Sequence, residues 1–245
     1  MRSFLGVTLV SALAVLGSPL NALAELERSH SGLDGFSHRL QTVLNSEGAT
    51  PFDAVATFEL QPVLTQRYQR FRQDFPEVTW RVEPAAPLAD GRQTLLLHVR
   101  GDAESDGLRY QLEATERIAI RLADGRMVDQ EVLAHESLLR SGERPIAVTL
   151  AIPDAVLTGS RYDIDLIVEE PLGQALVAAG LIDLSPQQVE DQVRPNLPLA
   201  PMAGGGLFKT VQAPQLPCTQ AWALMLVHPD GVVTATKRVR VVNSL

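Results

Sequence analysis

The amino-acid sequence of 245 residues lacks several features that mark large classes of protein. Its single cysteine, Cys218, excludes an internal disulfide and a multi-cysteine zinc site. A net charge of −8 argues against a nucleic-acid binder, because such proteins normally present a basic surface. No apolar run of about 18 residues or more follows the first 24 positions, so we predict no membrane span in the mature chain.

The motifs of common enzyme and cofactor sites are also missing. The sequence contains no G-x-S-x-G nucleophile motif, no G-x-G-x-x-G dinucleotide motif and no G-x-x-x-x-G-K phosphate-binding loop. His135 and Glu136 begin an H-E-x-x-H zinc motif, but Leu139 stands where the second histidine is needed. We therefore predict no cofactor and no catalytic residue, and a serine triad assembled from distant segments stays open as an alternative.

The first 24 residues have the order of a secretory signal peptide. A positive start at Arg2 is followed by an apolar run over residues 4–17 and by the small-residue site Ala22-Leu23-Ala24. Cleavage after Ala24 would leave 221 of the 245 residues in the periplasm or outside the cell. An uncleaved anchor is disfavoured, because an apolar run of about 14 residues is shorter than the ~20 that span a bilayer.

Residues 25–75 carry apolar side chains at helical spacing, which predicts a helical N-terminal segment. The segment contains two such stripes, so we predict two helices. The polar side of the second helix carries Arg67, Arg70 and Arg72, which are candidates for binding a partner. The alternative is a solvated helix face, and we favour it because acidic residues follow closely.

Residues 76–184 change to a period of two, which predicts half-buried antiparallel strands and a β-sandwich domain. Asp124-Gly125 is a hairpin-turn signal within this range. The stretch from Thr158 to Tyr162 resembles the corner before a late strand of immunoglobulin-like domains, which implies that the Tyr162 hydroxyl bonds back to the chain. We therefore predict a mainly β protein, an antiparallel immunoglobulin-like sandwich preceded by a short helical segment.

The rest of the chain reads as a connection followed by a hairpin. Residues 185–217 are rich in proline and glycine, and we interpret them as a surface linker or a loop that crosses between sheets. Residues 218–245 predict a C-terminal hairpin that packs on the sandwich or adds strands to it, with Trp222 in the core. We expect Cys218 to be buried and inert, and pairing with another molecule is the alternative.

One acidic cluster could hold a metal ion. Asp163, Asp165 and Glu169 share one face of a predicted strand, where carboxylates could bind calcium at the edge of a sandwich. The alternative is the polar face of a half-exposed strand, which we favour because no glycine-rich ligand loop accompanies them. Arg100-Gly101-Asp102 spells an integrin-type tripeptide, but we expect it merely to end a strand and enter a turn.

These observations favour an exported, non-catalytic β-sandwich protein that acts as a binding, assembly or structural module of the cell envelope or extracellular space. Its partner would be an envelope protein or a polysaccharide, and the sequence leaves the oligomeric state open. One alternative is an exported hydrolase or carbohydrate-active enzyme on the same scaffold, which requires catalytic groups gathered in a cleft. The other is an accessory subunit of an envelope complex that makes contact through the helices of residues 25–75.

Overall fold

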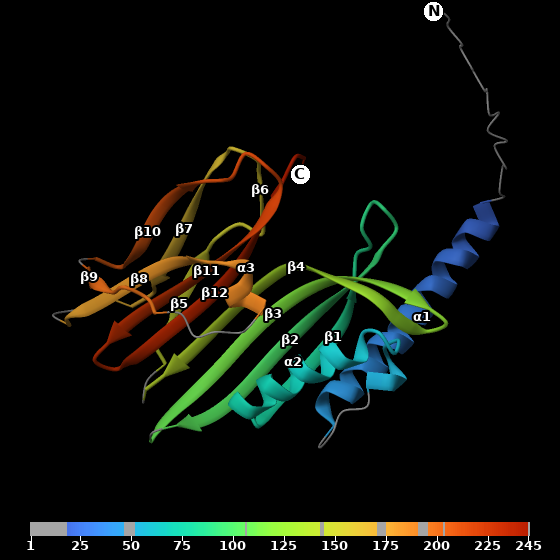
Figure 1. Cartoon of the computed structure of the whole chain (residues 1–245), viewed down its shortest axis with the longest axis horizontal. Coiled ribbons are helices and arrows are strands. Elements are labelled where there is room, and N and C mark those ends of the chain that lie inside the picture. The colour runs from blue at the N-terminus through green and yellow to red at the C-terminus, as the bar shows by residue number, and fades with distance from the viewer. Residues whose placement is uncertain are drawn as a thin grey trace, which may run out of the picture.

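The computed structural model describes residues 19–46, 52–105, 107–142, 145–170, 175–190, 196–202 and 204–244. Residues 1–18 of the predicted leader lie outside this part of the chain. Residues 19–24 begin helix α1 (Pro19–Asn45), which projects beyond the sheet at this end (Figure 1). Among the side chains that are described, the buried ones of α1 begin at Leu33, so cleavage after Ala24 would leave these contacts in place.

Two helices form where the apolar stripes predicted them. The side chain of Phe36 on α1 is completely buried, and it packs with the side chains one and two turns away on the same face. A single 3-10 turn, η1 (Phe52–Ala54), leads to α2 (Gln61–Asp74). Tyr68 of α2 donates a 2.7 Å hydrogen bond to the carbonyl of Leu44, which joins the two helices. In the described part of the chain, no helix is long and apolar enough to cross a membrane.

The larger of two sheets has nine strands, eight of them in the order β1-β2-β3-β4-β12-β11-β8-β9, with β6 paired to β12. The smaller sheet has the order β10-β7-β5. All pairings are antiparallel except the short one between β6 and β12. The protein is therefore mainly β with antiparallel sheets, as predicted. The strands are β1 (Glu77–Ala85), β2 (Gln93–Ser105), β3 (Leu108–Ala123), β4 (Arg126–Ser141), β5 (Val148–Ala151), β6 (Ala155–Leu157), β7 (Arg161–Val168), β8 (Val177–Leu184), β9 (Ala200–Met202), β10 (Gly206–Gln212), β11 (Cys218–His228) and β12 (Gly231–Val242).

The β3–β4 hairpin turns at the predicted place. Asp124 and Gly125 have φ angles of +51° and +73°, the left-handed conformation that a tight two-residue turn needs. Both strands are 16 residues long, longer than the short strands that the sequence suggested. The pairing with β4 shifts register between Arg117 and Ile118, next to the polar residue Glu116 that interrupts the apolar pattern of β3.

The C-terminal hairpin enters the large sheet rather than lying on it. β12 pairs with β4 on one side and β11 pairs with β8 on the other, so the last strands of the chain lie in the middle of the sheet. Residues 185–217 leave the large sheet after β8 and carry the short helix α3 (Pro186–Glu190), the edge strand β9 and the small-sheet strand β10 before β11 returns. This segment therefore crosses between the sheets and contributes strands on the way.

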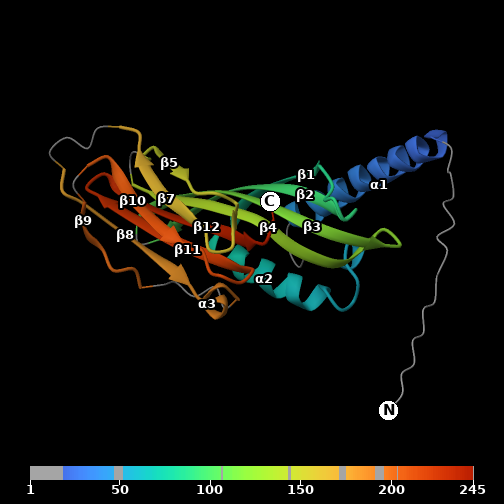
Figure 2. The ribbon, with the colours of Figure 1, turned by 90° about the horizontal axis from the view of Figure 1, so that it is seen from above.

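Each end of the large sheet is covered on a different face. We call the helix face the one that bears Val82 and Leu97, which pack under α1 and α2. We call the sandwich face the one that bears Leu138 and Ala235, which pack in the core shared with the small sheet. Figure 2 shows α2 and the strands of the small sheet on opposite sides of the large sheet. Each face is thus covered over only part of its width.

A buried lysine ties the two halves of the large sheet together. The Nζ of Lys237 on β12 lies 2.9 Å from a carboxylate oxygen of Glu136 on β4 and 2.6 Å from one of Asp154. Burial alone would lower the pKa of Lys237, but these two carboxylates outweigh it and raise the pKa. At the same junction, a Cβ at Gly142 would overlap the carbonyl oxygen of Asp230, so the close approach of the chains requires glycine there.

Tyr162 lies at the start of β7 as predicted, but its hydroxyl does not bond back to the nearby chain. It donates to the Oε1 of Gln220 at 2.9 Å and accepts from the Nε1 of Trp222 at 2.9 Å, both on β11. Asp183 joins this chain of bonds through Gln220, and burial raises the pKa of its carboxyl group. The expectation of a local tyrosine corner is wrong, because the partners come from the facing sheet. Trp222 is buried in the core, as predicted.

We expect the substitution Tyr162→Phe to lower the free energy of unfolding by about 1–3 kcal/mol, because it leaves the buried Trp222 Nε1 without an acceptor. Urea unfolding at pH 7 measures the change. Tyr110→Phe is the matched control, since its hydroxyl has no hydrogen-bond partner among the described residues, and it should change stability by less than about 0.5 kcal/mol. Equal effects of the two substitutions would contradict the role given to the Tyr162 hydroxyl.

Candidate functional site

Beyond the helices, the helix face of the large sheet carries a polar strip over β3, β4 and β12. Residues directly opposite on paired strands point to the same side of a sheet. Leu97 on β2 lies in the core, and the residues opposite it on the next strands, Glu116, His135 and Arg238, lie on the same side of the sheet. The next row brings Ser137 opposite Thr236. We define the polar strip as these five polar residues together with Arg240, two positions further along β12: Glu116, His135, Ser137, Thr236, Arg238 and Arg240.

Four of these side chains form a continuous chain of hydrogen bonds. His135 Nδ1 lies 3.0 Å from Glu116 Oε2, and His135 Nε2 lies 3.2 Å from Thr236 Oγ1. The hydroxyls of Thr236 and Ser137 are 2.6 Å apart. All contacts are satisfied when Ser137 donates to Thr236, Thr236 donates to Nε2 and Nδ1–H donates to Glu116. Glu116 and His135 are about one third exposed, so the chain of bonds reaches solvent.

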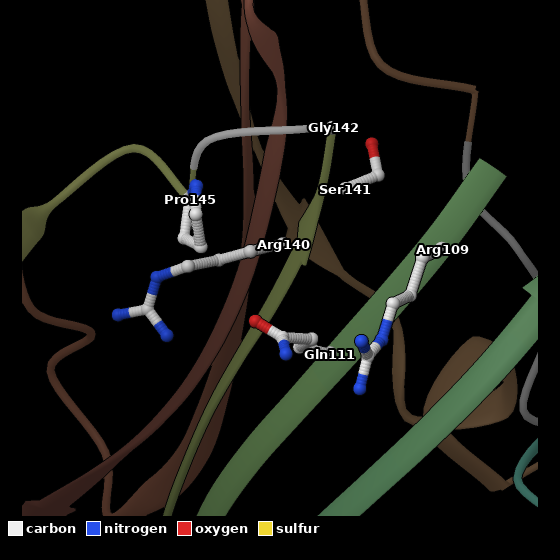
Figure 3. A pocket seen from close by; sticks show the side chains of 6 residues that line it. All are labelled: Arg109, Gln111, Arg140, Ser141, Gly142 and Pro145. Atoms are coloured by element: carbon white, nitrogen blue, oxygen red, sulfur yellow. The ribbon is translucent and has the colours of Figure 1, made fainter.

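This arrangement can hold one histidine tautomer and transfer a proton between a hydroxyl and the imidazole. The order carboxylate, imidazole, hydroxyl is the one that activates a nucleophile in acyl-transfer enzymes. A nucleophile also needs a cleft and donors for the developing oxyanion. Two surface depressions of the described residues, one lined by Arg109 (Figure 3) and the other by Arg100, include neither Glu116 nor His135. The tripeptide Arg100-Gly101-Asp102 borders the second depression from within β2, so the expectation that it ends a strand is wrong.

Arg238 and Arg240 are half-buried cations whose Nε atoms are buried without a hydrogen-bond partner. Neither guanidinium forms an ion pair with any residue that the structure describes. Burial lowers the pKa of Arg238, the carboxylates of Glu116 and Glu131 oppose this, and the nearby charge of Arg240 adds to the lowering. A partly desolvated charge is costly unless a counter-charge accompanies it. An anion near these two arginines could supply such a counter-charge.

The acidic cluster predicted from the sequence lies elsewhere, on and just after β7 in the small sheet. Asp163 accepts a 2.6 Å hydrogen bond from Thr210, and Glu169 accepts one of 2.8 Å from Thr149. Asp165 lies between them along the chain. Within the residues that are described, no group of three or more histidine, cysteine or acidic side chains is close enough to hold a metal ion. The structure thus does not gather these three carboxylates into a metal site.

The candidate arginines of α2 stay on the helix surface. Arg67 and Arg70 are exposed, whereas Arg72 is half-buried with its guanidinium 5.8 Å from the centre of the Tyr68 ring. None of the three residues belongs to the polar strip. They remain a charged outer face of the helical segment.

Cys218 is exposed, so the expectation of a buried thiol is wrong. The residue is the first of β11, and the nearby Leu216 is also exposed. Pairing with another molecule in an oxidising compartment stays a prediction.

Sequence reasoning missed four of the six residues of the polar strip. Thr236, Arg238 and Arg240 alternate along β12 with the buried Val239 and Val241. This alternation was visible in the sequence, but the position of His135 beside it was not. Ser137 gives no signal, because one serine in a strand is unremarkable until its cross-strand neighbour is known.

One family model matches the chain, with the description "Domain of unknown function (DUF8623)" and a match over residues 143–242. No curated protein matches the sequence. The match begins just after β4, so it includes the small sheet, α3 and the C-terminal hairpin but leaves out α1, α2 and β1 to β4. Arg238, Arg240 and Thr236 lie inside it, whereas Glu116, His135 and Ser137 lie outside.

Proposed function

We propose that this protein is an exported, non-catalytic binding module of the cell envelope or extracellular space, and that its polar strip recognises an anionic group. The observation that carries the proposal is the pair of half-buried arginines Arg238 and Arg240, whose Nε atoms are buried without a hydrogen-bond partner and which form no ion pair with a described residue. The hydroxyls of Ser137 and Thr236 lie on the same face and could add hydrogen bonds. An envelope protein or a polysaccharide that carries a phosphate, sulfate or carboxylate group has the required chemistry.

The scaffold in this proposal is an immunoglobulin-like sandwich. Two antiparallel sheets that share one core support it, as does a tyrosine at the start of a late strand. A rigid scaffold of this kind suits recognition, because β-strands hold the strip side chains at fixed spacing.

Export is supported by the order of charged, apolar and small residues in the first 24 positions. We expect the protein recovered from the periplasm or the culture medium to begin at Glu25. N-terminal sequencing or intact-mass measurement tests this. A protein that keeps Met1 and stays with the cytoplasmic fraction would contradict export.

Anion binding is tested with inorganic phosphate and sulfate as probes on residues 25–245. We expect each anion to raise the melting temperature relative to chloride at the same ionic strength, because only the folded strip binds it. Arg238→Gln and Arg240→Gln should each weaken binding by about 10-fold or more, the value of one charge-assisted hydrogen bond of about 1.5–3 kcal/mol. Titration calorimetry measures the affinities.

Arg121→Gln is the matched control, since Arg121 is an exposed β3 arginine outside the strip. It should leave the affinity for both anions unchanged. Equal stabilisation of the parent protein and of both strip variants would overturn the assignment of the anion site. Stabilisation by phosphate alone or sulfate alone would identify the anionic group that the strip prefers.

A hydrolase is the second candidate function, favoured by the Glu116–His135–Thr236 hydrogen-bond order. Against it stands the flat sheet surface on which the three residues lie. We expect p-nitrophenyl acetate to be hydrolysed without saturation and at a rate that His135→Gln changes no more than His38→Gln, a surface-histidine control. A saturable rate abolished by both His135→Gln and Thr236→Val would establish the hydrolase instead.

An accessory subunit that uses the helices remains a third possibility. The apolar side of α1 is occupied by the protein's own core, with Phe36 completely buried. A partner would therefore meet the charged outer side of α2, which carries Arg67 and Arg70. No apolar helix stripe of the described residues is left open for such a contact over Leu33–Leu44.

A further inference from the structure

The hydrogen-bond chain of the polar strip has a direction that its geometry fixes. In a neutral imidazole one ring nitrogen donates and the other accepts. His135 Nδ1 lies 3.0 Å from Glu116, whose ionised carboxylate can only accept, so Nδ1 carries the proton. Nε2 must then accept from the Thr236 hydroxyl, 3.2 Å away. Thr236 has no second proton, so Ser137 donates to it across 2.6 Å. Both hydroxyl protons are therefore directed toward the imidazole.

Protonation of His135 reverses this chain. Nε2 becomes a donor, and the Thr236 oxygen accepts its hydrogen. The Thr236 proton can then turn to the Ser137 oxygen, which releases the Ser137 proton from the chain. Ser137 and Thr236 are half-buried, so the released O–H can reach a ligand in solvent. A proton taken up by the imidazole is thus converted into a free hydrogen-bond donor at the other end of the chain.

Protonation also adds a positive charge beside the two arginines of the strip. β3 and β12 are the strands that flank His135, and they bring Glu116 and Arg238 directly opposite it on either side. Arg240 is two positions further along the same face of β12, and the carboxylate of Glu131 also acts on Arg238. Histidine is the side chain among these that changes its charge between about pH 8 and pH 5. The charge of the strip therefore depends on pH through His135.

We propose that the anion site of the polar strip, on which this inference rests, binds more tightly at acidic pH because protonated His135 adds one charge and frees one hydroxyl donor. Ser137 and Arg238 are diagonal neighbours on paired strands. Such neighbours are about 7–8 Å apart, within reach of a long side chain. A tetrahedral oxyanion between them could accept from the guanidinium and from the released hydroxyl at the same time.

Sulfate is the probe that tests this, because it keeps its charge in this pH range whereas phosphate does not. Titration calorimetry at equal ionic strength measures its affinity at about pH 7.5 and about pH 5.5, on either side of histidine protonation. We expect at least about 3-fold tighter binding at the lower pH, as one added charge about 6 Å away would give at a solvated site. His135→Gln should abolish this difference. Ser137→Ala should weaken binding more at the lower pH than at the higher one, which an effect of charge alone would not produce.

His98→Gln is the matched control. His98 follows Leu97 on β2 and therefore points to the sandwich face, so its loss should leave the pH difference unchanged. Circular dichroism at both pH values checks that each variant is folded. Nitrogen NMR of the His135 ring in sulfate-free buffer tests the chain of bonds by itself, and we expect the Nδ1–H tautomer at the higher pH.

The outcomes separate this inference from the proposed function. Equal sulfate affinities at the two pH values, with binding still weakened by Arg238→Gln, would overturn the inference and leave the anion site in place. A pH difference that survives in His135→Gln, or the opposite ring tautomer, would also overturn the inference alone. Absence of sulfate binding at both pH values would overturn the anion site and its regulation together.

Discussion

The pairing of β4 with β12 is the interaction on which the rest of the structure depends. It joins β4, which ends at Ser141, to β12, which begins at Gly231. In the sequence, the whole small sheet and its connections lie between these two strands. Lys237 reinforces it by bonding to Glu136 on the neighbouring strand and to Asp154 before β6. Without this pairing, the part of the chain with α1, α2 and β1 to β4 would be a separate body from the part with the small sheet and β11 and β12. Each part would then have an unpaired strand edge, whose backbone groups water or another chain would have to satisfy.

The helices cover the helix face at one end of the large sheet, and the small sheet covers the sandwich face at the other end. Each face is therefore open where the opposite face is covered. Strand alternation then decides what is exposed there. On β4, His135 and Ser137 point to the helix face, whereas Glu136, Leu138 and Arg140 point to the sandwich face. One strand thus supplies side chains to the polar strip on one face and to the Lys237 contact on the other.

The sequence predicted what depends on neighbouring residues. The apolar stripe around Phe36, the turn at Asp124-Gly125 and the closing hairpin are confirmed, because periodicity and turn chemistry are local properties. The partners of Tyr162 could not be predicted, since Gln220 and Trp222 follow it by 58 and 60 residues. The prediction that Cys218 is buried was wrong for a related reason. Whether a side chain at the end of a strand is covered depends on parts of the chain that are distant in the sequence. Glu116 is a polar residue within the apolar alternation of β3, and its role could not be inferred until its register with His135 was known.

The family match covers half of the polar strip. A site built on Arg238 and Arg240 is contained in the matched range of residues 143–242, together with the core that holds β12 in place. A catalytic site would need Glu116 and His135 as well, and both lie outside that range. Glu116 offsets part of the charge of Arg238, and its carboxylate is hydrogen-bonded to His135. Under the binding proposal, the guanidinium of Arg238, which forms no ion pair with a described residue, is the group that an external anion would contact.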